Sequence, residues 1–151
     1  MAGFTYNGLT TAIQNYMDNT ETTFTNTIPT FIQQAEEKIL KSVDLPVFRE
    51  NVTGTGSSGN TYLSTPTDFL SPRSLAVIDS SGNYSYLLLK HVSWIRDYTP
   101  AAATTGDPLF YALFDDNTFI LAPTPNSNFT FELHYFYRPS SLVDAGGTGT
   151  T

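Results

Sequence analysis

Two histidines, His91 and His134, are the side chains best suited to acid–base or nucleophilic chemistry in this chain of 151 residues. Either could be drawn into a Ser–His–Asp hydrolase, but the sequence contains no Gly-x-Ser-x-Gly nucleophile elbow. His134 lies within an alternating aromatic segment typical of a strand, and His91 precedes a short segment around Trp94 where it can cap a helical turn. We therefore interpret both histidines as structural residues and predict no catalytic residue.

The run Asp115-Asp116-Asn117 suggests a calcium site because carboxylate and amide oxygens are ligands that Ca²⁺ prefers. A calcium loop needs such oxygens at alternating positions and a closing Glu, and no Glu follows at the required spacing. Between two β-like segments, this run is more typical of a hairpin turn. The chain has no cysteine, which excludes disulfides and thiolate zinc sites. We predict no metal site and no cofactor.

The charge of the chain limits its partners. The formal net charge is −7, and the 7 Lys and Arg residues do not cluster, whereas a nucleic-acid binder needs a concentrated basic surface. No apolar run is long enough to span a membrane, and the N-terminus lacks the basic and apolar regions of a signal peptide. We expect a protein of the cytosol, or of a particle assembled there, with no membrane partner.

Two helices are predicted at the N-terminus. The first covers 5–18, with Leu9, Ile13, Tyr16 and Met17 on one side. The second covers about 27–44, with Asn26 or Thr27 as its cap, Pro29 in its first turn and Pro46 after its end. Its apolar residues follow a period of 3.6, which predicts a buried stripe with Phe31, Ile32 and Ile39 inside. The stripe consists of Ile28, Phe31, Ile32, Ala35, Ile39, Leu40 and Val43.

From Val47 onward the apolar period changes to two, which predicts strands. The expected strands are 47–53, 62–63, 73–79, 84–89, 109–114, 118–122 and 128–137, with a short helical segment at 92–98. In the last strand, Phe129, Phe131, Leu133, Tyr135 and Tyr137 share one face. The predicted fold class is therefore α+β: two N-terminal helices followed by an antiparallel β-sandwich or barrel-like sheet. We expect one domain with a helical part (1–46), a β-rich part (47–143) and a flexible Gly/Thr tail (144–151).

The segment 54–60 is predicted to be a mobile hairpin loop. It holds three glycines and no apolar residue, so its backbone is costly to order. We expect it to project from its hairpin and to contact a neighbouring subunit or a tail protein. The candidate contact residues are Gly54, Thr55, Gly56, Ser57, Ser58, Gly59 and Asn60.

Several phrases, in order along the chain, resemble the head-to-tail adaptor (connector) proteins of tailed bacteriophages, especially those of short-tailed phages. The resemblance covers residues 4 to 143. The phrases are IPTFIQQAEEKI at 28–39, LPVFR at 45–49, YLSTPTDFL at 62–70, GDPLFY at 106–111 and YFYRP at 135–139.

This resemblance implies a structural virion protein in the neck between head and tail, assembled in the host cytoplasm. Such adaptors form a homo-oligomeric ring, typically of twelve copies, under the portal protein, and they receive the tail or nozzle protein. The helices would contact ring neighbours and the portal, and the β-part would face the tail. DNA would pass through the ring without specific binding, which agrees with the acidic balance of the chain.

Two other functions are open from the sequence. The chain could be a carbohydrate- or receptor-binding β-module of a phage particle, because exposed aromatic side chains can stack on sugars. A small hydrolase is the third hypothesis, and it lacks a recognisable site. The adaptor is our leading hypothesis, and it is not an enzyme.

Overall fold

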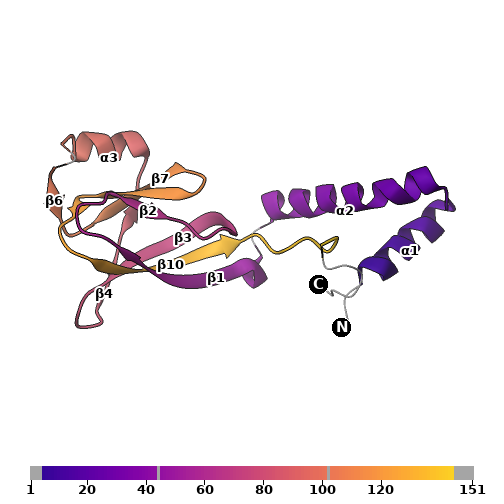
Figure 1. The fold of residues 1–151 in the computed structure, drawn as a ribbon, viewed down its shortest axis with the longest axis horizontal. Coiled ribbons are helices and arrows are strands. Elements are labelled where there is room, and N and C mark those ends of the chain that lie inside the picture. The colour runs from indigo at the N-terminus through magenta and orange to yellow at the C-terminus, as the bar shows by residue number, and fades with distance from the viewer. Residues whose placement is uncertain (1–4, 44, 102, 145–151) are drawn as a thin grey trace. The chain divides into compact units, whose positions relative to one another are not determined.

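The computed structural model describes residues 5–43, 45–101 and 103–144. The chain divides into two compact units (Figure 1). The β unit is Pro46–Arg138, and the helical unit consists of the described residues on either side of it.

The helical unit begins with α1 (Tyr6–Met17) and α2 (Thr22–Ser42). Thr5 caps α1 by accepting a hydrogen bond from the Gly8 N–H at 3.1 Å, and Asp18 ends it in the left-handed region with φ of 46°. The prediction of this helix is confirmed within one residue at each end. The second helix begins earlier than predicted, after Glu21, so neither Asn26 nor Thr27 is its cap and Pro29 lies inside it.

The predicted buried stripe of α2 is only partly correct. Ile28 and Ile32 are buried, but Phe31 is 51% exposed and Ile39 is 49% exposed. Residues four apart form rows along a helix, and Ile28 and Ile32 lie in a different row from Phe31 and Ile39. In the helical unit only the row of Ile28 and Ile32 is buried. On α1, Tyr16 is also exposed rather than packed with Leu9.

The third part of the helical unit is the segment 139–144, which follows the last strand and is fixed to α2 by Glu36. The Ser141 hydroxyl donates to Glu36 Oε2 at 2.7 Å, and the Leu142 N–H donates to Oε1 at 2.9 Å. The Leu142 side chain is buried. One carboxylate therefore anchors this segment beside the helix. Of the predicted tail 144–151, all but Asp144 lies outside the described residues.

The β unit contains two four-stranded sheets. The first has the order β1-β10-β3-β4 and is antiparallel throughout; the second has the order β2-β8-β7-β5, in which β5 and β7 are parallel. A parallel pair of β6 (Thr105–Gly106) and β9 (Thr124–Pro125) forms a third, small sheet. A short 3₁₀ turn, η1 (Pro46–Phe48), precedes β1.

The strands of the first sheet are β1 (Arg49–Gly56), β10 (Phe129–Tyr137), β3 (Phe69–Ile78) and β4 (Tyr84–Tyr86). Those of the second are β2 (Tyr62–Ser64), β8 (Thr118–Ala122), β7 (Phe110–Asp115) and β5 (Leu88–Leu89).

The main core lies between the two large sheets. The inward-facing residues of β10, among them Phe131, Leu133 and Tyr135, are buried with Leu75 of β3 and Phe119 of β8. Figure 1 shows these sheets stacked face to face, with α3 (Val92–Tyr98) on the outer side of the second. The α+β prediction is thus confirmed, including the shared face of 129–137 and the helix at 92–98.

The predicted strand 84–89 is divided between the two sheets. The buried Leu87 is the crossing point: its N–H donates to Leu75 O in the first sheet, and the next N–H, of Leu88, donates to Leu109 O beside the second. A segment that passes from one sheet of a sandwich to the other shows the same alternation of apolar residues as a single strand. The sequence pattern therefore predicted one strand where the structure has β4 and β5.

Gly56, at the end of β1, is expected to tolerate a side chain poorly. A Cβ there would lie 2.5 Å from Cε2 of Phe131, whose ring is buried in the core. Gly56→Ala should lower the free energy of unfolding by about 1–3 kcal/mol, as overpacking does, in chemical denaturation. Gly54→Ala is the matched control, because its Cβ would meet no heavy atom within 4 Å, and its effect should stay within about 0.5 kcal/mol. Equal effects of the two substitutions would contradict this prediction.

Candidate assembly surfaces

The two histidines lie in local structural contacts. His91 caps α3: its Nδ1 accepts a hydrogen bond from the Ser93 N–H at 3.3 Å. His134 lies on β10, with Nε2 3.4 Å from Glu132 Oε1. The contact between His91 Nδ1 and Ser93 Oγ, at 2.8 Å, joins residues two apart at the start of the helix. The cap predicted at His91 is confirmed.

The acidic run forms the turn between β7 and β8. The Asn117 N–H donates to Asp115 Oδ1 at 2.8 Å, which confirms the hairpin. Within the part of the chain that the structure describes, no three His, Cys, Asp or Glu side chains gather as a metal site.

The segment 54–60 is not the free loop that its composition predicted. Gly54 and Gly56 lie in β1, where they pair with Phe131 and Phe129 of β10. The rest is hydrogen-bonded to the turn before β10: the Gly59 N–H donates to Pro125 O at 2.8 Å, and the Ser58 N–H donates to Asn128 Oδ1 at 2.9 Å. Backbone pairing here offsets the entropy that the glycines lose. Ser57, Ser58, Gly59 and Asn60 remain exposed.

The outer face of the first sheet carries a polar cluster around Glu132. The Asn51 amide donates to Glu132 Oε1 at 2.9 Å, from the neighbouring strand. The hydrogen bond of Tyr84 to Glu132 raises the pKa of the Tyr84 hydroxyl. These contacts tie β1, β10 and β4 together across the sheet, so we assign the cluster a structural role.

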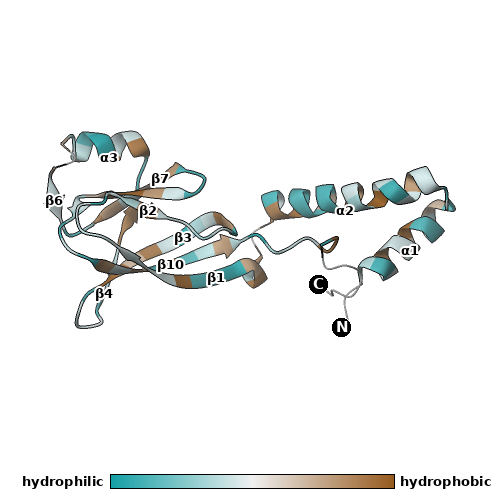
Figure 2. Ribbon diagram, viewed as in Figure 1, coloured by the Kyte–Doolittle hydropathy of each residue, from teal (hydrophilic) through white to brown (hydrophobic). Residues whose placement is uncertain are grey.

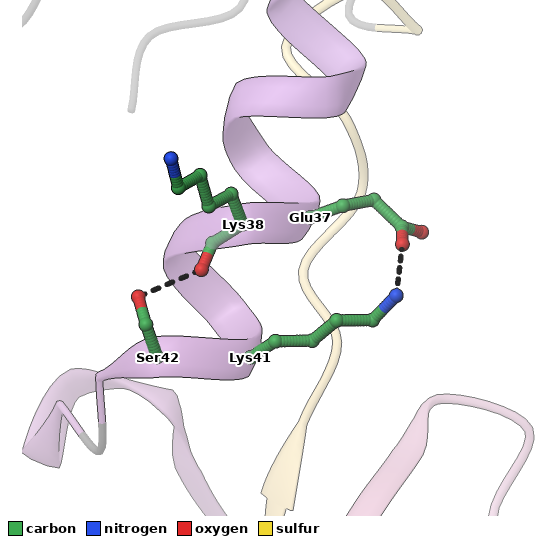
Figure 3. A network of polar contacts seen from close by, with 4 residues as sticks. All are labelled: Glu37, Lys38, Lys41 and Ser42. Atoms are coloured by element: carbon green, nitrogen blue, oxygen red, sulfur yellow. Dashed lines mark hydrogen bonds and ion pairs between the residues drawn. The ribbon is translucent and has the colours of Figure 1, made fainter.

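One candidate assembly surface is an apolar row on α2, which we call the α2 row: Phe31, Ala35 and Ile39. All three are exposed and lie four residues apart, on one line along a helix that is otherwise mostly hydrophilic (Figure 2). The last turns of the helix carry local polar contacts. Lys41 Nζ pairs with Glu37 Oε2 at 2.9 Å, and the Ser42 hydroxyl donates to Lys38 O at 2.7 Å (Figure 3). Contiguous exposed apolar side chains of this kind mark contact surfaces.

A second candidate surface lies on the outer face of the second sheet, around Phe110. Trp94 and Tyr98 stack at 5.0 Å, and both rings lie edge-on to Phe110, at 4.7 and 5.0 Å between centroids. Leu88 of β5 pairs with Phe110 in register, and Leu109 precedes it. The Lys90 ammonium lies 5.2 Å from the centroid of the Trp94 ring. The set that we call the Trp94 patch is Leu88, Lys90, Trp94 and Tyr98, all exposed.

This patch was not identified from the sequence, although part of its signal was present: Trp94 and Tyr98 are four residues apart in the predicted helix at 92–98, so they share one side of it, and Lys90 lies just before that helix. Because Tyr98 covers one face of the Trp94 ring, the patch does not present Trp94 as an open stacking platform. Trp94 therefore gives no support to the carbohydrate-binding hypothesis.

Among the helices that the structure describes, none is long and apolar enough to cross a membrane.

Comparison with known proteins identifies one family. The model of the SU10 adaptor protein family matches residues 4–150, nearly the whole chain. No curated protein matches the sequence.

Proposed function

Because the chain belongs to the SU10 adaptor protein family, whose members are head–tail adaptors of phages, we propose that it forms a ring joining the portal of the phage head to the tail. The match over residues 4–150 is the observation that carries this proposal. The protein is a phage adaptor and a virion component. In the proposed assembly about twelve copies, as in the adaptors it resembles, surround the path of the DNA in the neck of the particle, after assembly in the host cytoplasm.

The α2 row supports self-association. A helix that keeps Phe31 and Ile39 half exposed loses the free energy that their burial would supply, about 25 cal/mol per Å² of apolar surface. A neighbouring copy or the portal recovers it by covering the row. Charged residues make up only 14% of the chain, which suits subunit interfaces, since their centres are depleted of charge.

The charge of the chain supports passage of DNA without binding. Each copy has a formal net charge of −7, so a ring of copies repels the phosphate backbone. Unclustered basic residues also give little release of counterions, which is the main source of non-specific affinity for DNA.

The segment 54–60 stays a proposed contact with a neighbouring copy or with the tail or nozzle protein. Its exposed turn at 57–60 is the part available for that contact, because Gly54 and Gly56 are already paired with β10. The segment would contact its partner as an ordered hairpin end, with no ordering on assembly. A structure of the assembled particle in which 57–60 touch no other chain would contradict this proposal.

Electron microscopy of the purified protein, alone and with the portal protein, tests the function. Wild-type protein should form rings, and Phe31→Ala should reduce the ring fraction at least tenfold, since truncating a central interface residue costs about 2 kcal/mol or more. Its melting temperature should stay nearly unchanged, because the side chain is half exposed. Val47→Ala, an exposed apolar truncation in the β unit, is the control and should leave the rings intact. Wild-type protein that stays monomeric with the portal would contradict the function.

A further inference from the structure

The Trp94 patch combines three features of a docking surface. Leu88 is more than half exposed, the rings of Trp94 and Tyr98 pack on Phe110, with which Leu88 pairs, and β5 is the edge strand of its sheet. Among the described residues, no carboxylate lies within ion-pair distance of Lys90, whose ammonium rests over the Trp94 ring. The patch therefore suits an apolar segment that carries negative charge.

The end of α1 and the turn after it have this chemistry. Tyr16 is 89% exposed and Met17 is 55% exposed, and the carboxylates of Asp18 and Glu21 follow on the turn. In the part of the chain that the structure describes, neither carboxylate has a cation within ion-pair distance. We call residues 16–21 the α1 tip.

The α1 tip is held in a defined shape. The Asn19 N–H donates to Gln14 O at 3.2 Å, and the Glu21 N–H donates to Asn19 Oδ1 at 2.9 Å. The Gln14 side chain in turn donates to Thr25 Oγ1 at 2.9 Å, which links α1 to α2. Because the tip is ordered, little entropy is lost when it docks.

We propose that the α1 tip of one copy docks on the Trp94 patch of the next copy. Tyr16 and Met17 contact the apolar side chains of the patch, and Asp18 or Glu21 pairs with Lys90. The second copy is the chosen occupant because the two surfaces are complementary in charge as well as apolar, and both belong to the same chain. Two different surfaces that meet form a head-to-tail contact, which generates a ring when the rotation closes.

This inference rests on the proposed self-association and adds where the copies meet. It predicts that the positive and negative charges of the two surfaces can be swapped without loss of association. Lys90→Glu should reduce the association constant of the copies about tenfold, because it places a carboxylate opposite two others. Adding Asp18→Lys and Glu21→Lys to Lys90→Glu should restore association. Arg73→Glu, the same change of charge on an exposed residue of the first sheet, is the control and should have little effect. Association should be measured by sedimentation at fixed ionic strength.

Disulfide trapping gives a second measurement, which does not depend on closed rings. The chain contains no cysteine, so single cysteines can be introduced without competition. Met17→Cys protein mixed with Leu88→Cys protein under mild oxidation should give mostly the mixed dimer, well above the half that random pairing yields. Met17→Cys mixed with Val47→Cys should give the random ratio.

The outcomes separate the two proposals. Rings that persist with Lys90→Glu, together with a random ratio of trapped dimers, would overturn the docking contact and leave the adaptor ring standing. Wild-type protein that never assembles, even on the portal, would overturn the ring itself. Preferential trapping of the mixed dimer with loss and recovery of association across the charge swap would support the contact.

Discussion

Replacing Phe119 with Ala is expected to lower the free energy of unfolding by about 3–5 kcal/mol, the range of large-to-small changes at fully buried aromatic positions. Phe119 has no exposed surface, and its ring meets Phe69 and Tyr111 edge-on at 5.3 and 5.5 Å between centroids. These rings come from three strands on both sheets, so the cavity left by the substitution cannot collapse by moving one element alone. Denaturation in urea, followed by tryptophan fluorescence, measures the effect.

Phe114→Ala is the matched control for this substitution. Phe114 is 45% exposed near the end of β7 and contacts the Tyr62 ring at 5.1 Å, so its truncation should cost about 1 kcal/mol or less. If the two variants unfold at the same denaturant concentration, the core does not lie between the sheets as described.

The sandwich could be predicted because its alternation is local. In β10 every second residue from Phe129 is apolar, which assigns one face to the core without knowledge of the neighbouring strands. The hairpin turns were likewise marked by Asp, Asn and Gly residues, whose backbone preferences act within a few residues.

The exposure of α2 could not be predicted, because it depends on contacts that are not local in the sequence. An amphipathic period shows which residues share a face of a helix, but not how much of that face a partner covers. Ile28 and Ile32 are buried, whereas Phe31 and Ile39 are about half exposed. Both rows consist of apolar residues at helical spacing, so the sequence does not distinguish the buried row from the exposed one.

Contacts between segments far apart in the sequence could not be predicted either. Glu36 appears as an ordinary helix-surface carboxylate, yet it accepts two hydrogen bonds from residues more than a hundred positions away. In the same way, the glycines of 54–60 indicated mobility, because the strand β10 that orders them begins some seventy residues later.

The largest expected effect of pH concerns Tyr135, which is buried in the β unit. Its hydroxyl lies 3.1 Å from Asp68 Oδ1 and 3.3 Å from Glu50 Oε2. Burial of the side chain, followed by the hydrogen bond to Asp68 and the negative charges of Asp68 and Glu50, raises the pKa of Tyr135 from 10.0 to about 12. The neutral hydroxyl is therefore stabilised in the folded protein.

Because folding raises the pKa of Tyr135, high pH should destabilise the folded protein. A tyrosine whose pKa is raised by folding contributes its stability fully below pH 10, where both states hold the proton. As the pH rises from 10 towards 12, the unfolded chain releases the proton before the folded one, and the contribution is lost. Two pKa units correspond to about 3 kcal/mol of stability.

Wild-type protein should therefore lose about 3 kcal/mol more stability than Tyr135→Phe between pH 9 and pH 13, because the variant keeps the ring and has no proton to release. Urea denaturation at steps of half a pH unit measures both curves, and Tyr111, whose pKa burial also raises, titrates in both proteins and cancels in the difference. Near neutral pH the variant should be the less stable protein, since Asp68 and Glu50 lose their donor. The two curves should then converge and cross as the wild-type hydroxyl is forced to ionise beside two carboxylates. Parallel curves over the whole range would mean that Tyr135 titrates alike in the folded and unfolded states, which would contradict the effect of its burial and of its contacts with Asp68 and Glu50.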